Sequence, residues 1–404
     1  MLYLKKRNEK GFDKMKNIAI VGSGNISSLH IKSLLKFPER ARIVALVDIY
    51  PEKAEARKAE FNLSEAQVFA SHEEMIVSGL KIDLVHNCTP PYVHAPISID
   101  CMNAGINVLV EKPMATCLAE CDAMIEAANR NDVLLAAIAQ NRFQDPVNKL
   151  KQLADSGIAG KVRVAHVESL WWRGYNYYEL WWRGLWEKEG GGPTLNHAVH
   201  HIDMINWIQK ELPKEVTAVL ANVMHDNSEV EDLSFGILQY ENGSIGQVTS
   251  SVVHHGEEQG IILQCEDAKI AAPFDVKAEI SQGNGFPKTN TELITKITAQ
   301  YEAIPDLDYT GHAGQIDNVL TALANGTPTL ITGVDGRKTV ELISAIYKSG
   351  SQKKTVSLPL AKDDEFYTFE GILKNATRFY EKKGFVENFS AEAISVGRYE
   401  ENAK

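Results

Sequence analysis

Short apolar runs alternate with amphipathic helical patterns along the first third of the chain. Strands are expected at residues 18–21, 43–47, 68–69, 82–88, 108–110 and 133–139. Helices are expected between them, at 26–34, 51–60, from 71, 93–105 and 116–131. Because strands separated by helices pair through right-handed crossovers, this order predicts a doubly wound parallel sheet of the Rossmann type.

The hydrophobic pattern changes after about residue 141. A helix at 146–156 is followed by strand-like segments at 162–168, 214–223, 233–240, 244–253, 260–265 and 268–272. Turns such as Glu241-Asn242-Gly243 predict hairpins, and hence an α+β domain with a large, mostly antiparallel, open-faced sheet. Helices at 194–209, 312–325 and 335–349 are expected to cover one face, and a second subunit the other. Residues 275–310 are expected to be rich in loops.

A glycine turn joins the first strand to the first helix. Gly22 permits a tight turn, and Gly24 lets the backbone approach a pyrophosphate at the start of the helix, where Asn25 and Ile26 lie. Asp48 ends the second strand and can accept both hydroxyls of an adenosine ribose. We therefore expect bound NAD rather than NADP, because the carboxylate repels a 2′-phosphate. An ordinary turn without a ligand is the alternative.

Other polar residues follow later strands of the same predicted sheet. Thr89-Pro90, Glu111-Lys112 and Gln140 each stand where a strand ends. Ligands of parallel sheets bind at the carboxyl ends of the strands, so we expect these residues beside the cofactor.

Size and charge restrict the classes of function. At 404 residues the chain exceeds one typical core, so two domains are expected. The net charge of −11 argues against nucleic acids and anionic membranes as partners. No apolar run is long enough to span a membrane, and the polar start does not resemble a signal peptide. Five cysteines without a C-x-x-C pair indicate reduced thiols, so we expect a cytoplasmic protein.

Five of the six tryptophans fall within residues 171–186, where the sequence LWWRG occurs twice. Indole faces can stack on sugar rings, while Arg173 and Arg183 can donate to hydroxyls or carboxylates. The predicted sugar contacts are Trp171, Arg173, Tyr178, Trp182 and Arg183. The alternative is a loop whose tryptophans pack on their own domain.

The segment after Gly190-Gly191-Gly192 is rich in histidine. On one continuous helix, Asn196, His200 and Asp203 would share a face, with His197 beside it. Three interpretations are open: structural histidines, a metal site, or general acid–base chemistry. We favour the last and expect no metal, because alcohol oxidation moves a hydride and a proton, and histidine accepts a proton near neutral pH. Lys112 could stabilise the developing oxyanion.

Taken in order, these segments resemble the Gfo/Idh/MocA family (glucose–fructose oxidoreductase, inositol dehydrogenase, rhizopine catabolism). The resemblance rests on the glycine turn, Asp48, Thr89-Pro90 with His94, Glu111-Lys112-Pro113, Gly190-Gly191-Gly192 with His200-x-x-Asp203, Gly311-His312, Tyr347-x-Ser349 and Leu358-Pro359-Leu360. It implies a Lys112/His200 catalytic pair, tightly held NAD(P), a cis Lys112–Pro113 peptide and a dimer or tetramer formed through the second sheet. It also places Glu111 and His94 at the cofactor, and Asn196, His197, Asp203 and His312 at the substrate. Many members carry aspartate where this chain has Asn196.

The sequence therefore predicts an NAD-dependent oxidoreductase that oxidises or reduces a ring secondary hydroxyl of a sugar, glycoside or polyol. The expected partners are this small molecule and further copies of the chain. One alternative is a redox-neutral glycosidase or epimerase-like enzyme that retains its NAD; another is a dinucleotide sensor without turnover. The expected division is an extension at 1–14, an NAD(P)-binding domain at 15–141, a substrate-binding and oligomerisation domain at 142–360, and a C-terminal extension with a docked helix at 361–404.

Overall fold

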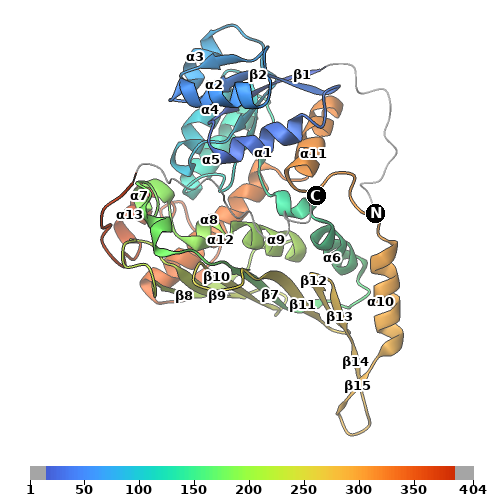
Figure 1. Cartoon of the computed structure of the whole chain (residues 1–404). Coiled ribbons are helices and arrows are strands. Elements are labelled where there is room, and N and C mark those ends of the chain that lie inside the picture. Colours follow the sequence, from blue (N-terminus) through green and yellow to red (C-terminus); the bar gives the residue numbers. More distant parts are fainter. Residues whose placement is uncertain (1–14, 387–404) are drawn as a thin grey trace. The chain divides into compact units, whose positions relative to one another are not determined.

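The computed structural model describes residues 15–386, which divide into two compact units (Figure 1). The first unit contains residues 15–114, 123–138 and 312–334, and the second contains 115–122, 139–311 and 335–386. The division does not follow a single cut in the sequence, because the chain returns to the first unit with one late helix. Each unit is described by itself below.

The first unit is built on a six-stranded parallel sheet in the order β3-β2-β1-β4-β5-β6. The strands are β1 (Lys16–Val21), β2 (Ala41–Val47), β3 (Gln67–Phe69), β4 (Leu84–Asn87), β5 (Asn107–Val110) and β6 (Leu135–Ala137). The central strands are buried along nearly their whole length, as expected when helices cover both faces of a parallel sheet. The predicted doubly wound fold is confirmed.

Local sequence signals explain where the helices of this unit begin. Pro51 occupies the first turn of α2, and the Ser71 hydroxyl accepts a hydrogen bond from the backbone N–H of Glu74 at the start of α3. The helices are α1 (Asn25–Leu34), α2 (Pro51–Glu60), α3 (His72–Val77), the 3₁₀ turn η1 (Pro91–Val93), α4 (His94–Asn103), most of α5 (Leu118–Arg130) and α11 (Gly311–Asn325).

An eight-stranded mixed sheet forms the frame of the second unit, in the order β13-β12-β11-β7-β10-β9-β8-β16. Its strands are β7 (Val162–Leu170), β8 (Glu215–Ala221), β9 (Leu233–Gln239), β10 (Ile245–Ser251), β11 (Gln259–Cys265), β12 (Lys269–Ala272), β13 (Asp275–Lys277) and β16 (Val356–Ser357). Only β7 and β10 pair in parallel; every other neighbouring pair is antiparallel. The predicted, mostly antiparallel sheet is confirmed.

One face of this sheet carries helices, and the other is open (Figure 1). The helices of the unit are α6 (Asp145–Ser156), α7 (Trp186–Glu189), α8 (Pro193–Asn196), α9 (Val199–Gln209), α10 (Thr291–Ala303), α12 (Gly333–Gln352) and α13 (Phe369–Asn375), with the 3₁₀ turns η2 (Gln140–Phe143) and η3 (Tyr175–Glu179). The open face presents Val219, Phe235 and Ile237, whose exposed fractions are 63%, 43% and 41%. Because Val219 pairs with Phe235 and Ile237 pairs with Thr217, these side chains form one apolar patch.

Three local expectations were wrong. Residues 194–209 form two helices, α8 and α9, because the N–H groups of His197 and Ala198 both bond to the carbonyl of Pro193 and close a turn. The segment 275–310 is not mainly loop: it contains β13, the two-stranded pair β14 (Glu279–Ser281) and β15 (Pro287–Thr289), and α10. The helix expected at 312–325 belongs to the first unit rather than to the second sheet.

The segments at the two ends are only partly described. Residues 361–386 contain α13, whose Ile372 is buried, whereas 1–14 and 387–404 lie outside the described residues. All five cysteines are free thiols, and burial raises the pKa of Cys101 and of Cys117 to about 12. Among residues 15–386, no helix has both the length and the apolar character needed to cross a bilayer.

Candidate functional site

The glycine turn of the first unit fits a pyrophosphate. Gly22 has φ +93°, and a Cβ there would lie 2.8 Å from the carbonyl carbon of Cys88, so only glycine fits. A Cβ on Gly24 would meet nothing within 4 Å, which leaves open space before α1. No side chain caps the N-terminus of α1, where Asn25 and Ile26 lie. Its N–H groups and the positive end of its dipole are therefore available to an anion.

Asp48 lies beside this turn, at the end of β2. Its Oδ2 accepts from the Ser23 N–H at 2.7 Å, and its Oδ1 accepts from the Tyr50 N–H at 2.9 Å. Arg57, which the sequence reasoning missed, donates from Nε to the Ser23 carbonyl at 3.3 Å. The turn is thus held by a carboxylate on one strand end and a guanidinium on α2, a contact that the i, i+3 charge pattern of α2 does not reveal.

His94 connects two of the predicted strand-end segments. Its Nδ1 lies 2.8 Å from the Pro113 carbonyl and its Nε2 lies 2.7 Å from the Thr89 carbonyl. Thr89 in turn donates its hydroxyl to Asn87 at 2.6 Å. The Lys112–Pro113 peptide is cis, as the family resemblance implies. His94 therefore ties the Thr89-Pro90 loop to the segment that carries Lys112.

Glu111 and His312, both predicted at the site, contact each other within a larger buried cluster. Oε1 of Glu111 accepts from His30 Nε2 at 2.8 Å and from His312 Nε2 at 3.3 Å, while its Oε2 accepts from the Lys112 N–H at 3.0 Å. Burial alone would raise the pKa of Glu111, but the two histidine donors hold it well below its usual value. The carboxylate therefore stays ionised although it is buried.

In the second unit, the three glycines place α8 against a buried carboxylate. A Cβ on Gly191 would lie 2.2 Å from the Tyr347 hydroxyl, and one on Gly192 would lie 2.1 Å from the Glu231 carbonyl. Glu231 accepts from the N–H groups of Gly192 at 3.2 Å and Thr194 at 3.1 Å, and from the Tyr347 hydroxyl at 3.1 Å. Burial raises the pKa of Glu231 to about 7. The sequence reasoning missed Glu231, because it stands among other acidic residues, Glu229 and Asp232, and nothing in the sequence distinguishes it from them.

The predicted aromatic platform and the histidine segment meet in this unit. The ring centroids of Trp171 and His197 are 5.4 Å apart, and those of Tyr177 and His197 are 6.0 Å apart. His200, half-buried, lies one turn further on α9. Tyr178 is buried against His225, so Tyr177 rather than Tyr178 contacts the histidine segment. Their adjacent positions in one sequence motif could not separate the two tyrosines.

Both arginines of the repeated LWWRG motif have protein partners. Arg173 pairs with Glu257 and stacks over Trp171 at 5.1 Å. Arg183 pairs with the buried Glu189 at 2.9 Å and lies between Tyr177 and Trp182, at 4.1 and 4.2 Å from the ring centroids. Trp186 is fully buried against Tyr347, while Trp172 and Trp181 are exposed. The segment is thus partly core and partly surface.

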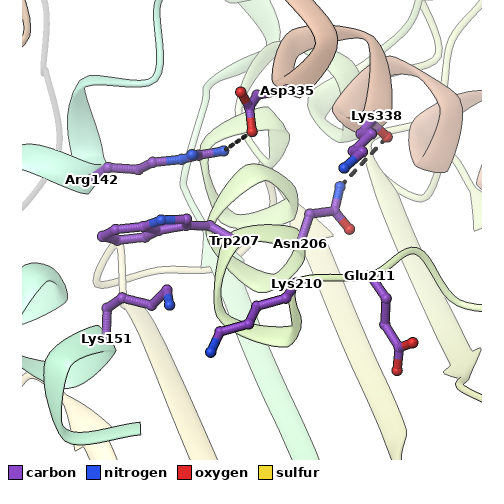
Figure 2. Close-up of a pocket in the computed structure, with 8 residues that line it drawn as sticks. All are labelled: Arg142, Lys151, Asn206, Trp207, Lys210, Glu211, Asp335 and Lys338. Atoms are coloured by element: carbon purple, nitrogen blue, oxygen red, sulfur yellow. Dashed lines mark hydrogen bonds and ion pairs between the residues drawn. The ribbon is translucent and has the colours of Figure 1, made fainter. Parts of the chain in front are cut away.

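Asp203 is not free to bind a ligand in this structure. Its two oxygens accept from Nε and Nη2 of Arg142, both at 2.7 Å, and Arg142 also pairs with Asp335 at 3.6 Å. Arg142 stacks over Trp207, 5.3 Å from its ring, beside a cavity of about 260 Å³ (Figure 2). Lys151 approaches the same ring at 5.4 Å, and Asn206 donates to the Lys338 carbonyl at 3.5 Å (Figure 2).

The remaining predicted residues lie as follows. Asn196 is the last residue of α8 and donates to the carbonyls of Gly191 and Gly192 at 2.8 and 3.2 Å. Because the helix is broken, Asn196 does not share one helical face with His200 and Asp203. Gln140 opens η2 and is buried. Lys112 lies in the first unit, whereas Gln140 and His200 lie in the second.

Comparisons with known proteins cover both units. Residues 16–138 match the model of the Gfo/Idh/MocA oxidoreductase family with its NAD-binding Rossmann fold. Residues 147–271 match the model of the C-terminal domain of the same family.

Several curated proteins are similar to the chain. Among them are 2,7-anhydro-N-acetylneuraminate hydratase of Mediterraneibacter gnavus, at 27% identity over 61% of this chain and 64% of that protein, and myo-inositol 2-dehydrogenase of Thermotoga maritima, at 24% identity over 84% and 98%. The match thus spans slightly under two thirds of the hydratase but nearly all of the dehydrogenase.

A solved structure adds a comparison of folds. The WlbA dehydrogenase from Bordetella pertussis, in complex with NADH and UDP-GlcNAcA, is 26% identical, with a TM-score of 0.74 over 86% of this chain and 99% of that one. A levoglucosan dehydrogenase in complex with NADH and levoglucosan, at 18% identity and a TM-score of 0.72, covers the same share of this chain and all of its own.

Proposed function

Because the chain belongs to the Gfo/Idh/MocA oxidoreductase family and carries its NAD-binding Rossmann domain, we propose that it oxidises or reduces a ring secondary hydroxyl of a sugar, glycoside or polyol. NAD, when bound, supplies the acceptor or donor of the hydride. The arrangement that carries the proposal is the strand-end edge of the first unit. There the open glycine turn, Asp48 and the Glu111-Lys112-cis-Pro113 segment follow strands of one parallel sheet.

We assign the cofactor contacts to the residues predicted from the sequence. The first turn of α1, with Gly24, Asn25 and Ile26, would bind the pyrophosphate, and Asp48 would accept the ribose hydroxyls. Thr89, Pro90, His94, Glu111, Lys112 and Gln140 would line the cofactor. Replacing Asp48 with alanine should raise the KM for NAD and narrow the preference over NADP, measured with both cofactors on one substrate.

Proton transfer is assigned to Lys112 and His200. An alcohol loses its proton as the hydride leaves, and an imidazole can accept it near neutral pH. A lysine ammonium can stabilise the developing oxyanion. Asn196 donates to backbone carbonyls and places no carboxylate beside His200, so His200 would act without the acidic neighbour found in many relatives.

The substrate would contact the aromatic cluster of the second unit. The rings of Trp171 and Tyr177 each lie beside that of His197, and Trp182 stacks on Arg183. Flat rings of this kind suit the C–H face of a pyranose. Since Arg173 and Arg183 are engaged with Glu257 and Glu189, we expect them to orient the rings more than to bind a substrate carboxylate. Relatives named for inositol and for a glucoside, and a similar structure solved with UDP-GlcNAcA, support a sugar or polyol as substrate.

The direct test is purified protein with NAD and a panel of polyols, monosaccharides and glycosides, followed by absorbance of the reduced nicotinamide. Lys112→Met and His200→Asn should each lower kcat by about 100-fold or more. As a control, Lys81 is an exposed lysine of the unit that contains Lys112, and Lys81→Met should leave kcat unchanged. No turnover of any substrate, with or without added NAD, would refute the proposal.

A redox-neutral reaction is the second candidate, because two of the similar proteins are named hydratases. Such an enzyme would oxidise and re-reduce the sugar with the same retained NAD. It predicts product formation without added cofactor and without net reduced nicotinamide. A sensor without catalysis would instead bind NAD and be indifferent to both substitutions.

We also propose that two or four copies assemble through the second sheet. The open face carries the apolar patch of Val219, Phe235 and Ile237, which a partner would cover.

A further inference from the structure

Four titratable groups form a buried chain in the first unit, and only Glu111 and His312 among them were predicted at the site. His30 comes from α1, His86 from β4, Glu111 follows β5, and His312 comes from α11. Their exposed fractions are 0%, 0%, 4% and 7%. Four separate segments of the chain thus contribute to one buried polar cluster.

The distances specify where the protons lie. His30 Nε2 and His312 Nε2 both face Glu111 Oε1, at 2.8 and 3.3 Å. An ionised carboxylate only accepts hydrogen bonds, so both histidines must carry a proton on Nε2. The Nδ1 atoms of His30 and His86 are 3.0 Å apart, and one of them must therefore be the donor. If His30 is neutral, its Nδ1 is the acceptor, and every donor in the chain points toward Glu111.

Charge and burial agree with this assignment. Burial lowers the pKa of His30 and, more strongly, that of His86, so both stay neutral at physiological pH. The Glu111 carboxylate carries the negative charge of the cluster, and its second oxygen accepts from the Lys112 N–H at 3.0 Å. A buried carboxylate that lost these donors would be destabilised and would shift or take up a proton.

A metal site is the competing interpretation. The ligand atoms of His30, Glu111 and His312 lie within 4.8 Å of one another. Ligands at about 2.1 Å from a tetrahedral zinc stand roughly 3.4 Å apart. The 2.8 Å contact between His30 and Glu111 is shorter than that and has the length of a hydrogen bond. The geometry therefore favours a hydrogen-bonded chain.

We propose that His30, with His86 behind it, and His312 are positioning residues that fix the Glu111 carboxylate and, through it, the backbone of Lys112. The role of Lys112 in this proposal rests on the proposed function, whereas the hydrogen-bonded chain of His86, His30, Glu111 and His312 does not. On the far side of the cis peptide, His94 contacts the Pro113 carbonyl, so the Lys112-Pro113 dipeptide is held at both ends. Because α1 begins at the glycine turn, the same chain links that turn to Lys112.

Two substitutions of His30 separate positioning from packing. Gln places an amide N–H near the position of Nε2 and can still donate to Glu111, whereas Asn reaches only the position of Nδ1. We expect His30→Asn to lower kcat roughly tenfold to a hundredfold, with His30→Gln within about threefold of wild type. The KM for NAD should be similar in the two variants, whereas the Tm should be lower in His30→Asn, because only that variant takes a donor away from the buried Glu111 carboxylate. Equal losses of kcat in both variants, or no loss in either, would overturn the proposal.

Readouts without turnover test the chain even if no substrate is found. Hydrogen exchange of the peptide covering residues 107–114 should lose protection at the Lys112 N–H in His30→Asn but not in His30→Gln. Spectra of ¹⁵N-histidine-labelled protein should show His30 as the neutral Nε2–H tautomer. An Nδ1–H tautomer, unchanged exchange in His30→Asn, or one zinc per chain by elemental analysis would overturn the proposal. Absence of any turnover, with these readouts as expected, would refute the proposed function alone.

Discussion

Two buried groups of the second unit should make the stability of the protein depend on pH in opposite directions over the same pH range. Glu231 has a pKa of about 7 because it is buried, and burial lowers the pKa of His201 to about 4. Neither ring nitrogen of His201 has a hydrogen-bond partner among residues 15–386. The ordinary pKa values are 4.5 for glutamate and 6.5 for histidine. Each group therefore makes stability depend on pH.

The signs follow from which state holds the proton more tightly. Glu231 binds its proton more tightly in the folded state, so its favourable contribution is complete below about pH 4.5 and is lost as pH rises through about 7. Between pH 5 and pH 8 the loss is about 2.5 kcal/mol. His201 binds its proton less tightly when folded, so lowering the pH from 8 to 5 costs about 2 kcal/mol. In the wild type the two effects nearly cancel.

Substitution of either group should reveal the pH dependence of stability that the remaining group contributes. Relative to wild type, Glu231→Gln should gain about 2.5 kcal/mol of unfolding free energy as pH rises from 5 to 8. Relative to wild type, His201→Leu should lose about 2 kcal/mol over the same rise. A lost hydrogen bond to the Gly192 N–H in the glutamine variant adds a penalty that does not vary with pH.

Urea unfolding followed by tryptophan fluorescence is the suitable assay. All six tryptophans belong to the second unit, so the signal reports the unit that holds both groups. A stability difference between Glu231→Gln and wild type that is flat with pH would refute the reasoning. A difference of the opposite sign would mean that the donors around Glu231 outweigh its burial.

Three further variants test other parts of the structure. Gly191→Ala should destabilise the protein by about 3 kcal/mol or more, because its Cβ would meet the Tyr347 hydroxyl, whereas Gly283→Ala, with open space around it, should stay within about 0.5 kcal/mol by urea unfolding. Phe235→Glu should convert the proposed assembly to monomers in light scattering, whereas Val77→Glu, in α3 of the first unit, should not. Arg142→Met should cost about 3 to 5 kcal/mol, because it leaves the buried Asp203 without its partner; an unchanged unfolding midpoint would contradict this.

The fold could be predicted closely because its signals are local. The helix at 51–60 begins with proline, and the helix that ends before Gly157 has that glycine in the left-handed region, so both were placed nearly residue by residue. The strand ends of the parallel sheet were predicted for the same reason. The break between α8 and α9 was not predicted, because the turn closed on the Pro193 carbonyl lies within one continuous helical pattern. The partners that anchor α8, Glu231 and Tyr347, are distant in sequence.

Polar partners of the site were mostly missed for one physical reason. Arg142 meets Asp203, Arg183 meets Glu189, and His30 meets Glu111, and in two of these pairs more than 60 residues separate the partners. Hydrophobic periodicity places a residue on an element but does not say which buried charge it will neutralise. The aromatic segment shows the same limit: its composition indicated a sugar platform that includes Tyr178, but packing places Tyr177 rather than Tyr178 beside His197.

The two residues assigned to proton transfer are each supported within their own unit. Lys112 is held through Glu111 and the histidines of the first unit, while the segment carrying His200 is anchored by Glu231, Tyr347 and the aromatic cluster of the second unit. Defects in sugar binding and defects in NAD binding should therefore arise from substitutions in different units. Trp171→Ala should weaken the affinity for the sugar while the affinity for NAD stays at the wild-type value. Asp48→Ala should weaken the affinity for NAD while the affinity for the sugar stays at the wild-type value. Equal loss of NAD affinity and of sugar affinity in either variant would mean that the contacts to each ligand do not depend on one unit alone.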